Sequence, residues 1–366
     1  IKYQCFINVN LESQEIEFQS CSVALLEMAI KHLTLNILSN VCEAQILFHD
    51  GNFEVCAPPL QNVKELCDLA SRENTCIMSM TGSMNYVVIG TTTKVVKTVE
   101  NLCRLTSSAI QIKYSIELHP DYKDFITGKK NGKIARIMDL TKVLISLDLQ
   151  KGQGNMIINL FSESISNAAK GISLLRNELP AEESFFIPEA YHRPVIGTGG
   201  SVIQTIMRKH NVFIQFSNTF HLPQNQFAHI RYDNVVIRCP TKNKLAIDPA
   251  KKELSQLAQE YSELQPRTLI RFSPGQYRFL TQNGGDWMDC LGDIEKRTNS
   301  YVVFPFKEPV EGYVLEIRGN DNSSAIASEE LITHFGREYE VNIASKIEKF
   351  TDFINSIVVP FKKSFG

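Results

Sequence analysis

The chain has 366 residues, with 38 Lys and Arg against 40 Asp and Glu and a formal net charge of −2. This length exceeds what one compact core usually supports, so several domains are expected. The balanced charge argues against a protein that is basic over its whole surface, so any nucleic-acid site must be a local patch.

The cysteines and histidines suggest no disulfide framework and no metal site. There are 9 cysteines, an odd number, and none forms a C-x-x-C pair. Cys67 and Cys103 lie in apolar segments, which predicts reduced, buried thiols in an intracellular protein. The 8 histidines form no H-x-x-x-H pair and no cluster with cysteine. We therefore expect no metal and no cofactor.

Apolar runs long enough to span a bilayer are absent from the sequence. The first ten residues, "IKYQCFINVN", also lack the charged-then-apolar order of a signal peptide. We expect a cytoplasmic protein without membrane association.

Residues 1–45 begin the chain with two predicted strands, "KYQCFINV" and "EIEFQS", and a predicted helix, "SVALLEMAIKHLTLNIL". Residues 46–112 follow with a helix in "NVKELCDLASRE", strands in "TCIMSM" and "NYVVIGT", and a helix in "KVVKTVENLCRLT". The second segment is a weak copy of a unit that recurs later, and the first resembles the second half of a further copy.

Residues 113–180 and 181–265 form an internal repeat without gaps between the matching positions. A shift of 69 residues places Tyr122 on Tyr191 and Gly128 on Gly197. The same shift brings apolar side chains into register, with Ile134, Ile137, Val143 and Ile145 on Ile203, Ile206, Val212 and Ile214. So many coincidences indicate a shared supersecondary unit.

Each copy reads as strand, helix, helix, strand, strand, helix. Pro120 and Pro188 stand at the start of the first helix, where proline is favoured. The second helix carries apolar residues three positions apart, and the next strand alternates apolar and polar residues. This order predicts an α+β unit of about seventy residues with a small antiparallel sheet.

Residues 266–340 give a looser fourth copy, with "TLIRF", "WMDCLGDIEKRT", "SYVVFPF", "YVLEIRG" and a helix near "SAIASEELITHF". Residues 341–366 are either a tail or the start of a further element. Neither 46–112 nor 266–340 keeps the glycine loop in register.

The segment "VIGTGGSVIQTI", followed by "NVFIQF", resembles the type I KH domain and its G-x-x-G loop. The resemblance implies an array of units of order β-α-α-β-β-α, each a three-stranded antiparallel sheet backed by three helices. In 113–180 the loop departs to Gly128-Lys129-Lys130-Asn131. Because Asn tolerates left-handed backbone angles, this loop is expected to keep its shape.

The two flanking units look like KH domains that have lost the loop. The whole chain is similar to multi-KH RNA-binding proteins of the vigilin and Bicaudal-C kind, and a fungal protein is one candidate. The resemblance is specific for 113–265 and extends to most of the chain through the weaker units.

This resemblance implies that the chain grips single-stranded RNA, with mRNA and post-transcriptional regulation as the expected context. Glycines let a sugar-phosphate backbone approach the main chain, and the helix N-terminus behind the loop favours an anion. An apolar floor would hold the bases. The expected RNA-binding residues are Gly128, Lys129, Lys130, Asn131, Lys133, Ile134 and Ile145, with Gly197, Thr198, Gly199, Gly200, Ile203, Arg208 and Ile214.

Two expectations concern how these side chains lie. Ile134 and Ile203 should be partly exposed in the groove, whereas Ile137 and Ile206 should belong to the core. Lys129, Lys130 and Lys133 lie beside a helix N-terminus, where cations are unfavourable, so a phosphate would relieve their cost.

Two other functions compete with RNA binding. An enzyme is not expected, because Val202 stands where a dinucleotide fingerprint needs Gly, and no G-x-x-x-x-G-K-[ST] occurs. The stronger alternative is a protein-interaction scaffold of degenerate units with vestigial RNA binding. The basic loop at 128–136 favours RNA. The sequence leaves open the oligomeric state, the protein partners, the base preference and the choice between RNA and single-stranded DNA.

Overall fold

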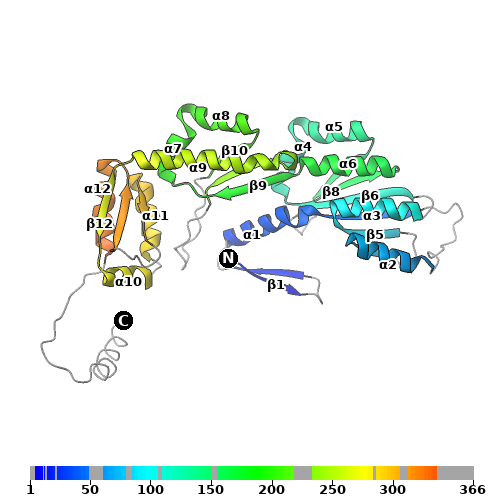
Figure 1. Cartoon of the computed structure of the whole chain (residues 1–366), viewed down its shortest axis with the longest axis horizontal. Helices are drawn as coiled ribbons and strands as arrows, with labels where there is room; N and C mark the ends of the chain where they lie inside the picture. The colour runs from blue at the N-terminus through cyan, green and yellow to red at the C-terminus, as the bar shows by residue number, and fades with distance from the viewer. Residues whose placement is uncertain are drawn as a thin grey trace, which may run out of the picture.

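A computed structural model describes residues 5–10, 12, 15–20, 23–48, 61–79, 85–105, 109–149, 155–217, 233–282, 286–305 and 312–335 (Figure 1). These residues form four β-sheets, and the six-stranded sheet, the unit of α9 and the unit of α12 follow one another along the long axis of the molecule. The segment 341–366 lies outside the described residues. Within the described ranges, no helix has the length and apolarity needed to cross a bilayer.

The first segment forms a two-stranded sheet followed by a helix. Its elements are β1 (Phe6–Asn10), β2 (Glu15–Gln19), α1 (Val23–Asn36) and the short 3-10 helix η1 (Leu38–Asn40). The strands pair antiparallel. These are the strand, strand and helix expected for 1–45.

The next two units share one six-stranded sheet of order β4-β5-β3-β6-β8-β7. The first contains β3 (Val41–Phe48), α2 (Gln61–Glu73), β4 (Cys76–Ser79), β5 (Asn85–Thr91) and α3 (Thr92–Leu105). The second contains β6 (Ala109–Leu118), η2 (Pro120–Tyr122), α4 (Lys123–Thr127), η3 (Lys129–Asn131), α5 (Gly132–Thr141), β7 (Leu144–Leu149), β8 (Met156–Ser162) and α6 (Ile165–Glu178).

The two halves of this sheet join through β3 and β6, which pair antiparallel along their length. One continuous core therefore underlies both units. β3 crosses the boundary predicted between residues 45 and 46, and β6 begins ahead of the start predicted at residue 113. No strand was predicted over "VCEAQILF", because the segment follows a helix directly and its alternation of Cys42, Ala44 and Ile46 becomes clear only in the sheet.

The third and fourth units each have a separate three-stranded sheet. The third contains β9 (Pro180–Phe185), α7 (Glu189–Ile196), η4 (Thr198–Gly200), α8 (Ser201–His210), β10 (Phe213–Phe216), β11 (Val235–Pro240), η5 (Thr241–Ala246) and α9 (Ile247–Leu264). The fourth contains β12 (Arg267–Arg271), α10 (Pro274–Gln282), α11 (Asp286–Thr298), β13 (Tyr301–Val303), β14 (Val314–Arg318) and α12 (Asp321–His334).

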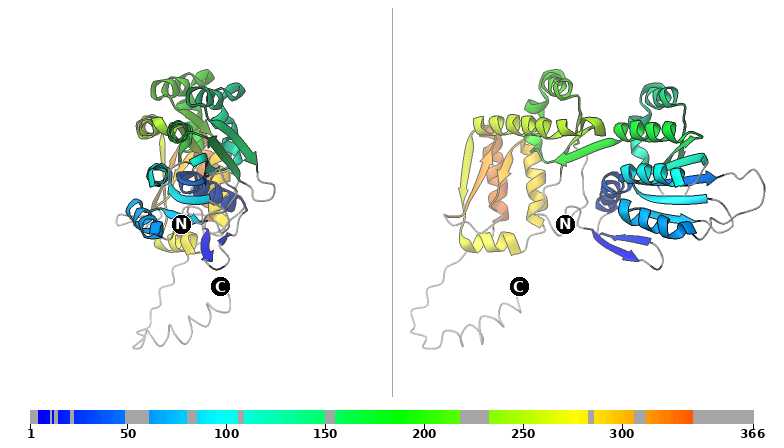
Figure 2. Two further views of the ribbon diagram at one scale, coloured as in Figure 1. Left: turned by 90° about the vertical axis from the view of Figure 1, so that its right-hand side faces the viewer. Right: turned by 45° about the vertical axis from the view of Figure 1, so that its right-hand side comes forward.

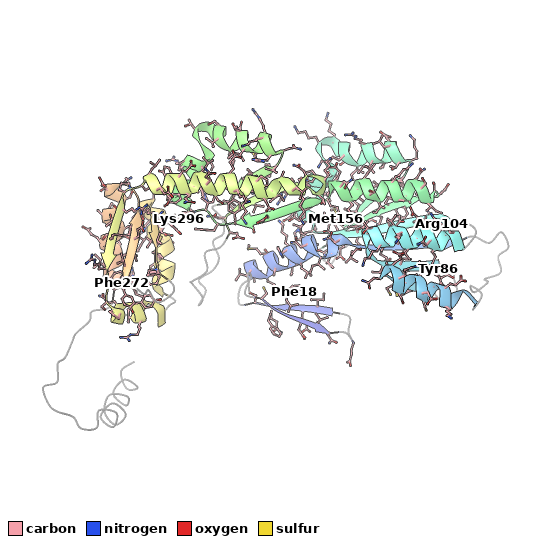
Figure 3. The ribbon with its side chains drawn as sticks, in the orientation of Figure 1. Phe18, Tyr86, Arg104, Met156, Phe272 and Lys296 are labelled. Atoms are coloured by element: carbon pink, nitrogen blue, oxygen red, sulfur yellow. The ribbon has the colours of Figure 1, made fainter. Side chains whose placement is uncertain are left out.

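The same strand order recurs in every unit, with the third strand between the first and the second. It reads β10-β11-β9 in the third unit and β12-β14-β13 in the fourth, and both halves of the six-stranded sheet repeat it. Figure 3 labels Met156 in the shared core and Phe272 in the separate core of the fourth unit. The α+β class predicted from the sequence is confirmed.

The expectation of buried thiols holds for some of the described cysteines and is wrong for others. Cys42 and Cys239 are buried, and burial raises the pKa of the Cys42 thiol to about 12. Cys67 and Cys76 are exposed instead. Leu69 and Glu73 are the buried residues described in α2, and Cys67, two residues before Leu69, lies on a different side of the helix.

Candidate nucleic-acid interface

The two loops of the central repeat share one backbone shape. Gly128 has φ 68° and ψ −177°, and Gly197 has φ 77° and ψ 166°. This region of the Ramachandran plot is essentially confined to glycine. Both loops then close with the same contact, in which the fourth residue donates its N–H to the carbonyl of the first, at 3.2 Å and 3.0 Å.

The third and fourth positions of each loop are left-handed. In the third unit these are Gly199 at φ 60° and Gly200 at φ 78°. In the second unit they are Lys130 at φ 52° and Asn131 at φ 57°. The prediction that Asn131 preserves the loop is confirmed, and Lys130 adopts the same uncommon conformation.

Both loops end at a helix start that no side chain caps. Asn131 precedes α5 and Gly200 precedes α8, and neither position makes a side-chain capping hydrogen bond. Backbone N–H groups at a helix start have no partner within the helix, and the helix dipole adds partial positive charge there. Each loop therefore presents a place that suits an anion.

The two loops differ in the charge of their exposed residues. Lys129 and Lys130 are exposed at the tip of the first loop, and Arg136 is exposed one turn further along α5. In the second loop the exposed positions are Thr198 and Gly199, which carry no charge. The first loop therefore offers cations as well as backbone donors.

Lys133, which was expected beside a phosphate, makes its contacts within the protein. Its Nζ donates a hydrogen bond to the Phe125 carbonyl at 3.0 Å and lies 4.5 Å from the centroid of the Phe125 ring. It also lies 3.4 Å from Glu178 Oε2. The stem passes under the loop, since a Cβ placed on Gly128 would be 3.0 Å from Lys133 Cγ. Lys133 thus supports the loop from below.

Val202 occupies the corresponding place in the third unit. A Cβ placed on Gly197 would lie 2.5 Å from Val202 Cγ2, which is closer than real side chains approach. The two loops are therefore supported differently, one by a charged side chain and the other by a branched apolar one.

Comparison with known proteins identifies the units that carry this geometry. A model described as the YLL032C fourth KH domain-containing protein matches residues 184–258, and one for the fifth KH domain matches 267–336. A model described as YLL032C fifth KH domain-like matches 107–171, and one for the third KH domain matches 1–42. The chain is built from tandem KH domains.

The relatives point the same way. The KH domain-containing protein YLL032C of Saccharomyces cerevisiae is 44% identical over 99% of this chain. K homology domain-containing protein 4 of Mycosarcoma maydis is 32% identical over 67% of the chain, and human vigilin is 28% identical over 66%. The chain spans only 45%, 17% and 18% of these relatives, respectively. The matched relatives are KH-domain proteins rather than enzymes, which confirms that prediction.

The isoleucines of the KH units correct the expected floor of the groove. Ile134 and Ile203, expected to be partly exposed, are only 6% and 7% exposed. Ile137 and Ile206 are buried as expected. Residues three positions apart share one face of a helix, so both members of each pair pack into the core together. The strand residues Ile145 and Ile214 are buried as well.

Sequence reasoning overlooked one pair of exposed apolar residues. Leu144 and Phe213 are equivalent in the repeat and are 61% and 52% exposed. They begin β7 and β10, which are edge strands of their sheets among the described residues. The alternation with buried neighbours was the available signal, because successive strand residues point to opposite faces.

Arg208 is exposed in the last turn of α8. Its neighbours Lys209 and His210 instead contact Glu253 of α9, at 2.9 Å and 2.7 Å. Hydrogen bonds from His210 and Lys209 lower the pKa of the Glu253 carboxyl. Within the described residues, no group of His, Cys, Asp and Glu is placed to hold a metal ion.

Proposed function

We propose that the chain binds single-stranded RNA through the two KH units that carry glycine loops. The observation that carries the proposal is the shared backbone of residues 128–131 and 197–200, each followed by a helix start without a side-chain cap. KH loops of this kind clamp the backbone of about four nucleotides. Lys130 and Asn131 keep this shape at a backbone cost that glycine would avoid, which supports a binding role for the loop.

The contacts divide between backbone and bases. Phosphates lie against the main-chain N–H groups of both loops, and Lys129 and Lys130 add charge in the second unit. Bases lie along β7 and β10, whose outer edges face no neighbouring strand among the described residues. Main-chain groups of these edges read the bases. The largely buried isoleucines, Ile134, Ile145, Ile203 and Ile214, form the apolar wall beneath the bases.

The wider role that we propose is the one expected from the family resemblance. The ligand is an mRNA, the setting is the cytoplasm, and the effect is post-transcriptional regulation. The units without a glycine loop, 46–112 and 266–340, add contacts to protein partners. The proposal involves no cofactor and no metal.

The test is a titration of labelled single-stranded RNA by fluorescence anisotropy at several salt concentrations. One variant carries Lys129→Asp with Lys130→Asp, and a second carries Thr198→Asp with Gly199→Asp. Each should lose about tenfold or more in affinity, or at least 1.4 kcal/mol. In the lysine variant the dependence on salt should also weaken, since about two phosphate contacts are lost.

Matched variants separate charge from shape. Asn in place of Asp at the same four positions keeps the side-chain size and removes the negative charge. A pair of exposed lysines on α6 and α9, changed as Lys170→Asp with Lys252→Asp, alters net charge as much as the Lys129 and Lys130 variant, and more than the Thr198 and Gly199 variant, without touching a loop. Equal affinity of the loop variants and this control pair, with all proteins folded by circular dichroism, would refute the proposal. A protein partner would then be the ligand to seek.

A further inference from the structure

A tyrosine marks the junction between consecutive units at the same position of the repeat. Tyr122 and Tyr191 each lie near the start of the first helix of their unit, and they are 0% and 3% exposed. Each is close to an arginine of the following unit, Arg238 or Arg318, as the distances below show. We call the contacts around Tyr122 the first lock and those around Tyr191 the second lock.

The first lock joins the second unit to the third. Tyr122 Oη donates a hydrogen bond to Glu182 Oε2 at 3.1 Å. Arg238 Nε donates to the same oxygen at 2.6 Å, and its guanidinium carbon lies 5.0 Å from the centroid of the Tyr122 ring. Burial, followed by the charge of Glu182, raises the pKa of the Tyr122 hydroxyl. The hydroxyl therefore remains a donor across the physiological range.

The second lock joins the third unit to the fourth. Tyr191 Oη and Ser262 Oγ lie 2.9 Å apart, and Arg318 Nη1 donates to Ser262 Oγ at 2.5 Å. The Tyr191 ring also meets the Tyr301 ring edge-on, with centroids 5.7 Å apart. A tyrosine and an arginine thus recur at both junctions, although the residue between them changes.

The two arginines are equivalent by strand register. Arg238 follows Ile237 in the middle strand β11 and lies opposite Phe213 at the start of β10. Arg318 follows Ile317 in the middle strand β14 and lies opposite Tyr301 at the start of β13. The same two positions of the KH unit therefore contribute to both junctions, although α6 and α9 lie along one line in Figure 1 whereas α12 runs across α9.

A second bridge ties the first loop to the third unit. Glu178, at the end of α6, lies 3.4 Å from Lys133 under the loop and pairs through its other oxygen with Lys242 of η5. Beside it, the Thr241 N–H donates to the Leu179 carbonyl at 2.8 Å. The support of one loop is thus linked directly to the next unit.

These contacts place both loops on one side of the molecule. Figure 1 and the right-hand view of Figure 2 both show α5 and α8 along the same side, above α6 and α9. The grooves that these helices border therefore lie on the same side of the second and third units. Two sites held in fixed relation lose less entropy when one ligand fills both.

We propose that the second and third KH units form one preset platform that takes a single continuous RNA strand with one polarity through both grooves. This inference rests on the proposed function, since it specifies the ligand of the same two loops. A short RNA fills one groove, and a longer strand gains the second groove only when its direction is maintained.

The experiment compares three ligands on the full chain. The first is an RNA of about five nucleotides, enough for one groove. The second is an RNA of about twenty nucleotides, several times the length that one groove contacts. The third has the same length and bases as the second but carries a 5′–5′ linkage at its centre, so that its halves run in opposite directions.

A lock variant, Arg238→Gln with Tyr122→Phe, removes the polar contacts of the first lock and leaves Lys133, Glu178 and Lys242 under the loop unchanged, and circular dichroism confirms folding. Wild type should prefer the continuous strand over the inverted one by about fivefold or more. Only a strand that keeps its direction can fill both fixed grooves and gain from tethering. The lock variant should lose most of that preference and keep its affinity for the short RNA.

The outcomes separate the two proposals. If wild type binds the continuous and inverted strands equally, or if the folded lock variant keeps the full preference, the platform is wrong. The proposed function then still stands wherever short-RNA affinity depends on Lys129 and Lys130. If wild type binds no RNA of any length at low salt, the proposed function fails and the platform fails with it.

Discussion

The loops at 128–131 and 197–200 reach one backbone shape through different chemistry. The sequence Gly-Thr-Gly-Gly places glycine wherever φ is positive, whereas Gly-Lys-Lys-Asn places Lys130 and Asn131 in the left-handed region. Each such residue costs on the order of 1 kcal/mol. The first loop therefore carries strain and positive charge together, and the second carries neither. The comparison indicates that the first loop keeps a lysine at position 130 although glycine would lower its backbone strain.

The supports beneath the loops differ in the same way. Lys133 holds the first loop through a hydrogen bond to Phe125 and an ion pair with Glu178. Val202 holds the second loop by contact alone. Changes at these positions should therefore affect one unit and leave the other unchanged.

The largest effect is expected from Gly197→Ala. The new Cβ would lie 2.5 Å from Val202 Cγ2 and 3.1 Å from the Val202 nitrogen, so part of the obstruction is backbone. We expect about 3 kcal/mol less protection of α8 amides in native-state hydrogen exchange. Gly128→Ala should cost about 1–2 kcal/mol in α5, because its nearest neighbour is the flexible Lys133 stem.

Gly199→Ala separates strain from overlap, since its φ is 60° but no atom lies within 4 Å of the new Cβ. It should cost less than Gly197→Ala. Equal losses for the two variants would show that Val202 does not limit the loop.

A smaller effect is expected from Lys133→Met, which keeps a long apolar stem under Gly128 but removes the ammonium group. Loss of one charged hydrogen bond, partly screened by solvent, should cost α5 about 1 kcal/mol. If Lys133 only supports the loop, the salt dependence of RNA binding stays that of wild type, whereas Lys129→Asp with Lys130→Asp weakens it. A weaker salt dependence in Lys133→Met would restore the direct phosphate contact first expected.

The fold of the central units could be predicted from the sequence because their signals are local. A repeat without gaps, helical spacing of Ile134 and Ile137, and alternation around Ile145 each depend on nearby residues only. The pairing of β3 with β6 was not predictable in this way. Any β-strand edge can pair with another, and the choice between neighbouring units depends on contacts far apart in sequence.

The candidate site was predicted at the level of the loop but not of each side chain. Loop position follows from glycine and asparagine tolerance of positive φ, which is a property of single residues. The burial of Ile134 and the retention of Lys133 depend on what packs against α5. Phe125 lies in α4 and Glu178 in α6, outside the helix that carries Lys133, so residue spacing alone does not reveal these contacts.

A still smaller effect is expected from Lys130→Gly, which makes the first loop more like the second. Glycine relieves the left-handed strain but gains freedom in the unfolded chain, so the net gain in α5 should be about 0.5 kcal/mol. RNA affinity should fall in the same protein, because one exposed cation is lost. The measurement pairs hydrogen exchange with anisotropy, and a variant that loses both stability and affinity would show that Lys130 stabilises the loop.

The smallest effect is expected from acid. Burial opposes ionisation of Glu178, but the hydrogen bond and charge of Lys242, and then those of Lys133, outweigh it and lower the pKa of this carboxyl. A carboxyl with a lowered pKa stabilises the fold fully above its unfolded pKa of about 4.3, and that contribution disappears as pH falls through the lower folded value. Amide chemical shifts of residues 129–132 should therefore move as pH falls from about 6 to about 3, while those of 198–200, above Val202, stay nearly constant. Glu178→Gln is the matched control and should abolish the movement. A loop at 129–132 that ignores pH in wild type would mean that Lys133 holds it through the Phe125 carbonyl alone.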